Sequence, residues 1–243
     1  MSVADNEYPK ASNATLIGSS LTYIAGLFLL FAFAGPYWLE SYPEMFSEFK
    51  HMGLWEYCFN RFRFPSYQFD KLFHGCHYIF SEEYYVIREW LLPGWLMIVQ
   101  AFVTLALMLS LLAQIVLACV VVRWPLRTVL RYEWICVSFA FICVALSSSF
   151  LFLAVAIFGG NAYRRDWLLY PSFNVLSWSY AFAVIAFMIF GVAAVLLYFE
   201  AQKLYELRRE AKNLVAQMQH SQPSNTLHQL HHQLQQQRAA GYI

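Results

Sequence analysis

The sequence predicts an all-α membrane protein with four spanning helices and a small extracellular β-sheet. Hydrophobic residues make up 60% of the 243-residue chain, and charged residues avoid four stretches of 29 to 33 residues, at 11–39, 90–122, 134–163 and 167–199. About 20 apolar residues in a helix cross a bilayer core, so each stretch is long enough to span a membrane. Basic and aromatic residues alternate after the first stretch, which is typical of a strand.

These stretches divide the chain into predicted segments. The segment 1–15 lacks the basic region and cleavage site of a signal peptide, so the first span is expected to remain in the mature protein. A four-span domain follows at 16–199, and a tail occupies 200–243. The spans are expected at about 16–36, 91–122, 134–158 and 177–199, with extracellular loops at 37–90 and 159–176.

The distribution of basic residues predicts that both termini are cytoplasmic. An even number of spans places the termini on one side, and short basic segments favour the cytoplasm. The first loop carries five basic residues, but it is long and also carries eight acids, so its charges count less. The basic residues that define the cytoplasmic side are Arg123, Arg127, Arg131, Lys203, Arg208, Arg209 and Lys212.

The composition of the spans excludes several functions. They contain no Asp, Glu, Lys, Arg or His, which argues against haem held between helices and against proton-coupled transport. No Cys-x-x-Cys pair is present, and the serines at 147–149 have no base near them in the sequence. The chain is therefore not expected to be an enzyme or to hold a cofactor. Its net charge of +1 gives no basic face for nucleic acid.

Histidines in the tail raise the question of a metal site. His228, His231 and His232 have a spacing that a metal could use. No acid or cysteine accompanies them, so no metal is predicted.

Two cysteines lie outside the predicted spans, Cys58 and Cys76. With the termini inside, both face the oxidising exterior, where two thiols in one loop usually pair, so a disulfide is expected. The alternative is two free structural cysteines. The other three, Cys119, Cys136 and Cys143, are expected to pack within the membrane, although Cys119 could instead be acylated.

The first loop also carries the strand pattern. Arg61 and Arg63 alternate with Phe62 and Phe64, and the segment 72–80 is again rich in aromatic residues. A period of two places the aromatic and basic side chains on opposite faces of an antiparallel sheet. The arginines could simply solvate an exposed face, or they could line a path for ions.

An ordered motif gives a resemblance to a known family. Trp38 follows the first span, Gly53, Leu54 and Trp55 precede Cys58, and Cys76 and Arg88 precede the second span. This order resembles the claudin signature of Trp, Gly-Leu-Trp, Cys and Cys. Seventeen residues separate the two cysteines, so the chain looks most like the divergent claudin-like proteins of invertebrate septate junctions.

The resemblance implies both a fold and a function. It implies a left-handed four-helix bundle, a sheet built mainly from the first loop, and a disulfide between Cys58 and Cys76. Trp55 is expected to bury its ring against the membrane side of the sheet, with its N–H on a polar partner, and Arg88 to tie the first loop to the bundle.

The implied role is a structural and barrier component of an occluding junction, septate or tight, in the lateral plasma membrane. It would associate with itself or with other claudin-like proteins in cis and in trans. Because the wider superfamily shares the motif, the alternative is an auxiliary channel subunit that resembles the gamma subunits of calcium channels.

The tail continues the fourth span with apolar residues at helical spacing, so the helix is expected to extend into it. Past Pro223 the tail is rich in Gln and His, and disorder is expected there until a partner binds. The chain ends in Tyr242 and Ile243, which resembles the ending of many claudins and suggests a PDZ scaffold as a partner.

Overall fold

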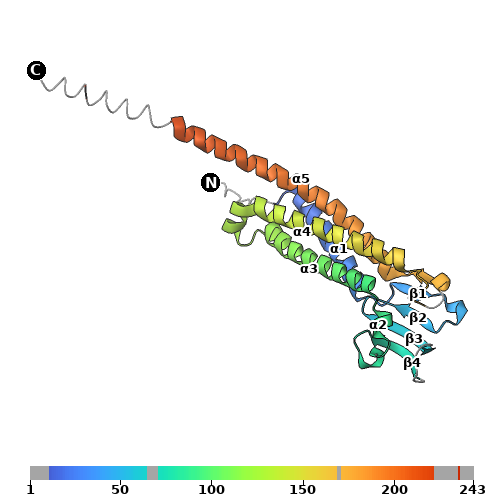
Figure 1. The fold of residues 1–243 in the computed structure, drawn as a ribbon. Coiled ribbons are helices and arrows are strands. Elements are labelled where there is room, and N and C mark those ends of the chain that lie inside the picture. Colours follow the sequence, from blue (N-terminus) through green and yellow to red (C-terminus); the bar gives the residue numbers. More distant parts are fainter. Residues whose placement is uncertain (1–10, 65–70, 169–170, 222–234, 236–243) are drawn as a thin grey trace, which may run out of the picture. The chain divides into compact units, whose positions relative to one another are not determined.

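The computed structural model describes residues 11–64, 71–168, 171–221 and 235. The chain divides into two units, residues 1–200 and residues 201–243, which are described separately. The first unit holds a helix bundle and a β-sheet, and the sheet lies at one end of the bundle (Figure 1).

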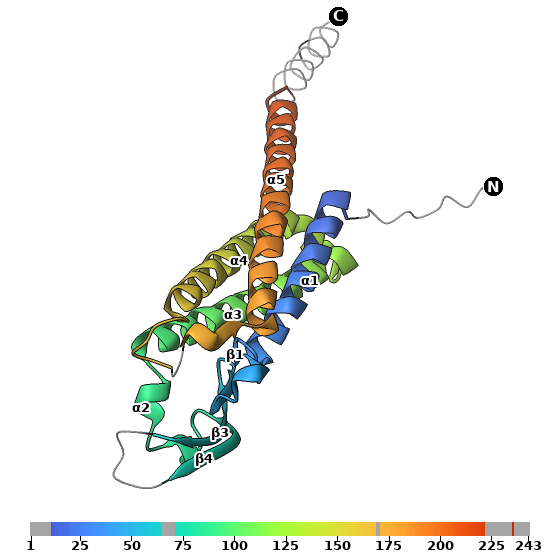
Figure 2. The same cartoon turned by 90° about the vertical axis from the view of Figure 1, so that its right-hand side faces the viewer.

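Four helices in the described part are long and apolar enough to cross a membrane. The helix α4 begins at Leu126, well before the predicted start near residue 134. The prediction followed the charge-free stretch, which leaves out the polar and basic residues of the first two turns of α4. The predicted fold class, a multi-pass membrane protein with a four-helix bundle and a small sheet, is confirmed (Figures 1 and 2). The four helices are α1 (Asn13–Ala34), α3 (Gly94–Val122), α4 (Leu126–Asn161) and α5 (Trp178–Ser221).

Small residues bring the helices together. A Cβ atom at Gly18 of α1 would lie 3.0 Å from the side chain of Leu197 on α5, so α1 and α5 are in close contact there. On α4, Ser147 donates to the carbonyl of Ala106 on α3 (3.1 Å), and Ser148 donates to a carbonyl on α5 (3.0 Å). These hydroxyls therefore serve helix packing, which is their usual role in membrane proteins.

The sheet has five strands in the order β4-β3-β2-β1-β5, and all neighbours are antiparallel. Four strands come from the first loop, and β5 comes from the second loop and pairs with β1. The second loop is thereby fastened to the first. The strands are β1 (Leu39–Ser41), β2 (Phe49–Met52), β3 (Glu56–Arg63), β4 (Leu72–Tyr78) and β5 (Asn174–Leu176).

Short helices complete the sheet end of the molecule. After β4, the chain forms η2 (Glu82–Tyr84) and α2 (Arg88–Leu91) before it enters the bundle. The other two are η1 (Pro43–Met45) between β1 and β2, and η3 (Pro171–Phe173) before β5.

The predicted alternation on β3 is confirmed. Phe62 is fully buried, whereas Arg61 and Arg63 are exposed. The register between β3 and β4 shifts near Arg61, whose φ of 54° is left-handed, so a β-bulge interrupts the pairing there.

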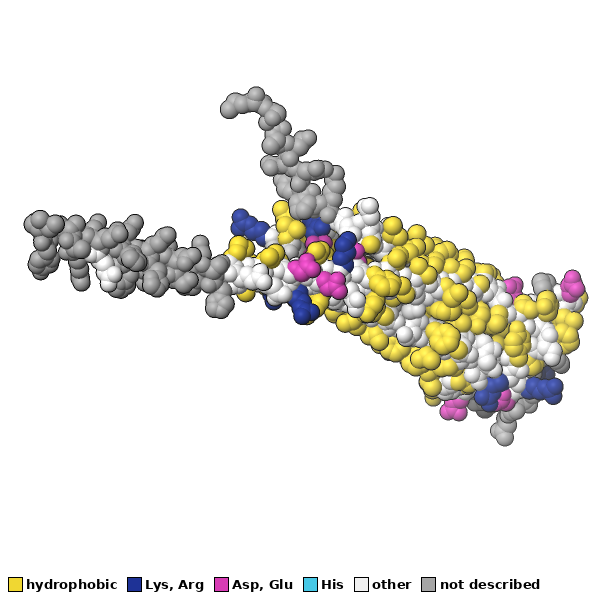
Figure 3. Space-filling view, turned by 90° about the horizontal axis from the view of Figure 1, so that it is seen from above, with side chains coloured by type: hydrophobic (Ala, Val, Ile, Leu, Met, Phe, Trp, Pro, Cys, Tyr) yellow, Lys and Arg dark blue, Asp and Glu magenta, His cyan; other side chains and the backbone are white. Residues whose placement is uncertain are grey.

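The surface of the molecule separates apolar from charged side chains. Hydrophobic side chains cover the visible face of the helices, and acidic and basic side chains lie at both ends of this hydrophobic surface, one of them the end where the sheet lies (Figure 3). This pattern fits helices that face lipid and a sheet that faces water.

An ion pair joins α3 and α4 beside their connection, at the end of the bundle away from the sheet. Arg123 ends α3 with a φ of 57°, and its Nη1 lies 2.6 Å from Oε2 of Glu133 on α4. Their side chains are only 12% and 16% exposed, so the pair joins the two helices in a largely dehydrated position.

The second unit contains the C-terminal part of α5, which runs to Ser221 as the helical spacing predicts. Most of its described side chains from Gln202 on are exposed. The histidines at 228, 231 and 232 and the terminal pair Tyr242 and Ile243 lie outside the described residues.

Candidate functional site

The motif residues meet where the sheet joins the bundle, and Trp38 is at the centre of this junction. The indole is fully buried, and its Nε1 donates to the carbonyl of Ala32 in α1 (2.7 Å). The ring packs against Phe158 of α4 and Tyr180 of α5, with centroids 4.9 and 5.8 Å apart. The backbone N–H of Trp38 bonds to Met52 on β2, so this one residue links three helices to the sheet.

Gly53 follows β2 at a point of close backbone approach. A Cβ atom there would lie 2.6 Å from the carbonyl oxygen of Gly35 and 2.7 Å from Cα of Pro36. Both are backbone atoms that cannot rotate away, so only glycine fits. The glycine of the motif therefore lets the turn between β2 and β3 lie directly on the end of α1.

Leu54 connects the same turn to α3. Its side chain is fully buried, and its carbonyl oxygen accepts a hydrogen bond of 2.6 Å from Nε2 of Gln100. Gln100 is itself buried in the first half of α3. Gln100 was not among the residues predicted from the sequence, because its side chain is neither charged nor a histidine. A neutral amide in a charge-free stretch is the signal that could have found it.

Trp55 packs its ring against Phe33 near the end of α1, with centroids 5.3 Å apart. Its backbone carbonyl accepts from the N–H of Ile79, just after β4 (2.9 Å). The expectation that its indole N–H has a polar partner is wrong for the described residues, because Nε1 is buried without one. The ring faces another aromatic side chain instead of a carbonyl, so Trp55 acts here through apolar contact.

Arg88 binds the chain that follows β4. Its Nε donates to the carbonyl of Ile79 (3.2 Å), and its Nη2 donates to the carbonyls of Phe80 (3.2 Å) and Ser81 (3.1 Å). The guanidinium also lies over the ring of Tyr85, 5.5 Å from its centroid. Because Ile79 bonds both to Arg88 and to Trp55, the arginine fastens the segment that holds the Gly-Leu-Trp turn.

The disulfide expected between Cys58 and Cys76 is present. The two residues lie directly opposite each other on β3 and β4, with their Cα atoms 4.0 Å apart. In the chain-entropy model, a loop of this size stabilises the fold by about 3 kcal/mol. The disulfide therefore fixes the pairing of the two longest strands.

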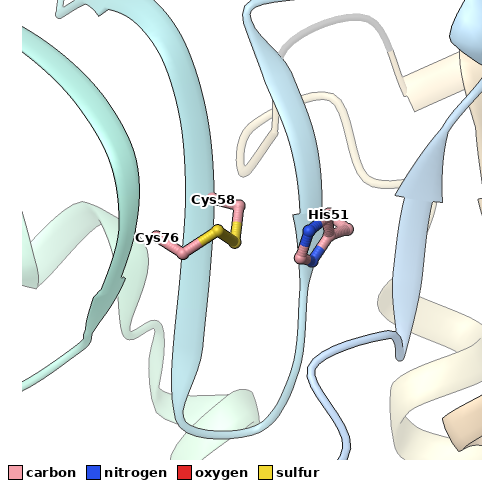
Figure 4. Close-up of side chains that lie close together, drawn as sticks. All are labelled: His51, Cys58 and Cys76. Carbon is pink, nitrogen blue, oxygen red and sulfur yellow. A yellow bond between two sulfur atoms is a disulfide. The ribbon is translucent and has the colours of Figure 1, made fainter.

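His51 on β2 lies beside this disulfide (Figure 4). One nitrogen of His51 and the two sulfur atoms all lie within 4.8 Å of one another. The sulfurs are bonded to each other and carry no thiolate charge, so the group does not offer the ligands that a zinc ion needs. The ring instead stacks on Tyr37, with centroids 4.1 Å apart, and its Nδ1 lies 3.0 Å from the carbonyl of Pro36.

An aromatic core fills the space between β3 and the segment before α3. Tyr57 donates from its buried hydroxyl to the carbonyl of Leu91 (2.7 Å), and Tyr84 donates to the carbonyl of Tyr57 (2.9 Å). Phe62 stacks on Trp90 with centroids 5.6 Å apart. Burial raises the pKa of both tyrosine hydroxyls, so they remain neutral donors at physiological pH.

The arrangement has no reactive group at its centre. It consists of carbonyl oxygens that are satisfied by Trp38, Gln100 and Arg88, a glycine that permits contact, and a disulfide. Its effect is to hold the sheet in a fixed relation to the helices. This is the chemistry of a rigid structural attachment.

Comparison with known proteins identifies the family of the chain. The profile of the PMP-22/EMP/MP20/claudin tight junction family matches residues 23–199, which include the sheet, the motif, the second half of α1 and the other three spans. The chain belongs to this family. A comparison with curated proteins gives no match. The family assignment confirms the resemblance that was drawn from the Trp, Gly-Leu-Trp, Cys and Cys order.

Proposed function

We propose that this claudin-family protein is a structural and barrier component of an occluding cell junction, and that it limits paracellular flux by associating with its own kind. The observation that carries the proposal is the attachment of the sheet to the bundle through Trp38 and through the hydrogen bond between Leu54 and Gln100. A sheet that is fixed to its helices keeps one orientation when helices of neighbouring copies pack side by side. Lateral association in the membrane then aligns the sheets into a continuous line.

The proposed orientation places the sheet outside the cell and both termini in the cytoplasm. Arg123, Arg127 and Arg131 lie at or near the connection between α3 and α4, away from the sheet. Basic residues of short connections favour the cytoplasm. The disulfide supports the same orientation, because such bonds persist in oxidising compartments.

The connection between β1 and β2 supplies a surface for contact with the opposite cell. Phe46 is 90% exposed and has a left-handed φ of 47°, and Tyr42 and Met45 beside it are about half exposed. Three exposed apolar side chains in one short connection favour burial against another protein. This tip is the part of the described sheet that we propose for association in trans.

The C-terminal residues Tyr242 and Ile243 are proposed as a ligand for a PDZ scaffold. A free carboxylate after an aliphatic side chain can extend the sheet edge of such a domain. The scaffold would hold the protein at the junction.

A mixing experiment tests the proposed function. Cells without occluding junctions express the chain with either of two fluorescent labels and are grown together with cells that lack it. We expect the protein to concentrate where two expressing cells meet and to form continuous strands there. Equal distribution over free and contacting membrane, together with co-purification with a pore-forming protein, would contradict the proposal and favour an auxiliary channel subunit.

A further inference from the structure

A cavity lies between the end of α1 and the sheet. Its volume is about 430 Å³, within the range of small-molecule sites. It is lined by Phe33, Ala34, Gly35 and Pro36 at the end of α1, by Gly53 and Trp55 from the turn between β2 and β3, and by Glu56 and Tyr78 from the sheet. Because Ala34 is the last residue of a membrane-spanning helix, the cavity lies where the hydrocarbon of the bilayer meets the headgroups.

Three aromatic side chains from three different elements line the cavity. Phe33 belongs to α1, Trp55 to the turn before β3, and Tyr78 to β4. The rings of Phe33 and Trp55 are in contact, and Tyr78 lies directly opposite Glu56 in the pairing of β3 and β4. Directly opposite residues of an antiparallel pair point to the same face, so a ring and a carboxylate lie together on one wall.

The formal charge of this lining is negative. Glu56 is the ionisable acid among the lining residues, and they include no Lys or Arg. The end of α1 contributes the negative end of a helix dipole, and its last turn has no basic residue to offset it. Aromatic faces also attract cations through their quadrupoles. The cavity is thus complementary to a cation.

We propose that this cavity binds the quaternary ammonium group of a phosphatidylcholine headgroup. Such a group is a weakly hydrated cation, and aromatic rings are the walls that recognise it. A primary ammonium, as in phosphatidylethanolamine or lysine, has three N–H donors and holds its water more strongly. It would gain less from three rings and a single carboxylate. Because the cavity lies at the level of the headgroups, the choline group can enter it while the lipid stays in the bilayer.

Lipid retention by the purified full-length protein tests the proposal. The protein is prepared in a maltoside detergent and mixed with equal amounts of phosphatidylcholine, phosphatidylethanolamine and phosphatidylglycerol of identical acyl chains. Bound lipids are counted by native mass spectrometry. We expect phosphatidylcholine to be retained roughly fivefold more than either competitor, the ratio that about 1 kcal/mol of cation–π attraction gives. Free phosphocholine should displace it.

Two lining variants locate the site. Tyr78→Leu keeps an apolar side chain of similar reach without a ring, and Glu56→Gln keeps the shape without the charge. Each should lower phosphatidylcholine retention roughly threefold to tenfold. Matched controls are Tyr163→Leu, an exposed tyrosine outside the lining, and Glu44→Gln, an exposed acid of η1. Both controls should retain the lipid as the wild type does, and an intact disulfide shows that each variant has folded.

Several results would overturn the proposal. Equal retention of the three lipids by the wild type would do so, as would a preference for the anionic lipid. Unchanged retention in both Tyr78→Leu and Glu56→Gln would place the bound lipid elsewhere. A third contrary result is a wild-type protein that retains no choline lipid and forms dimers that Glu56→Gln abolishes. The cavity would then bind a lysine or arginine of a second copy.

Discussion

Gln100 of α3 donates a hydrogen bond of 2.6 Å from its Nε2 to the carbonyl oxygen of Leu54, in the turn between β2 and β3. Both residues are buried, so neither group has water as an alternative partner. The bond crosses from a membrane-spanning helix to the sheet. It complements Trp38, which makes the corresponding link from the sheet to α1.

Gln100→Leu is expected to loosen this attachment. The leucine fills the space, but it leaves a buried carbonyl without a donor, which costs about 1 to 3 kcal/mol. The purified protein should lose thermal stability, and amide exchange should rise in residues 53–56. Thr104→Val, one turn further along α3, removes a hydroxyl that bonds only within its own helix (2.7 Å) and should have little effect. Equal behaviour of the two variants would show that the bond to Leu54 is unimportant.

Arg88→Lys tests the three hydrogen bonds from Arg88 to the segment after β4. A lysine keeps the charge, but its single nitrogen cannot reach the carbonyls of Ile79, Phe80 and Ser81 together. Amide exchange in residues 79–85 should rise by roughly tenfold, which corresponds to about 1.4 kcal/mol. The exposed Arg165 provides the matched control as Arg165→Lys. Exchange that is unchanged in Arg88→Lys would mean that charge alone holds this segment.

The disulfide should behave as one unit. Cys58→Ser and Cys76→Ser should each reduce delivery to the cell surface, because each removes about 3 kcal/mol of constraint on the unfolded chain. The double variant should be no worse than either single one, since the second substitution has no bond left to remove. Surface biotinylation measures delivery. Normal delivery of either single variant would make the bond dispensable.

Membrane orientation can be measured with glycan acceptors. Asn13 begins the one natural Asn-x-Ser/Thr sequence, and it should stay unmodified because the proposed orientation places it on the cytoplasmic side. Met45→Asn places an acceptor two residues before Ser47 at the exposed tip between β1 and β2, and that site should be glycosylated. A shift in mobility on removal of N-glycans reports each one. A glycan at Asn13, with none at the engineered site, would reverse the orientation.

The sequence predicted the parts of the fold that depend on composition. The four helices follow from the absence of charge over long stretches, and the exposure of Arg61 and Arg63 beside buried Phe62 follows from simple alternation. The disulfide followed from the location of its two cysteines outside the spans. Each of these is a local property of the chain.

The attachment itself could not be predicted, because it depends on distances between segments far apart in the sequence. Gln100 is one neutral residue in an apolar helix, and nothing local indicates that it reaches Leu54. The pairing of β5 with β1 joins two loops that are far apart in the sequence, and three residues are too few for a strand pattern. The buried indole nitrogen of Trp55 likewise reflects what packs around it.

Paracellular flux after depletion and rescue tests the central claim most directly. A polarised epithelium that normally makes the protein is depleted of it, then supplied with the wild type or with Trp55→Ala, which loses the contact with Phe33. We predict that depletion raises tracer flux, that the wild type restores the barrier, and that Trp55→Ala reaches the surface yet leaves the leak. An unchanged barrier after depletion, or full rescue by Trp55→Ala at the junction, would contradict the account.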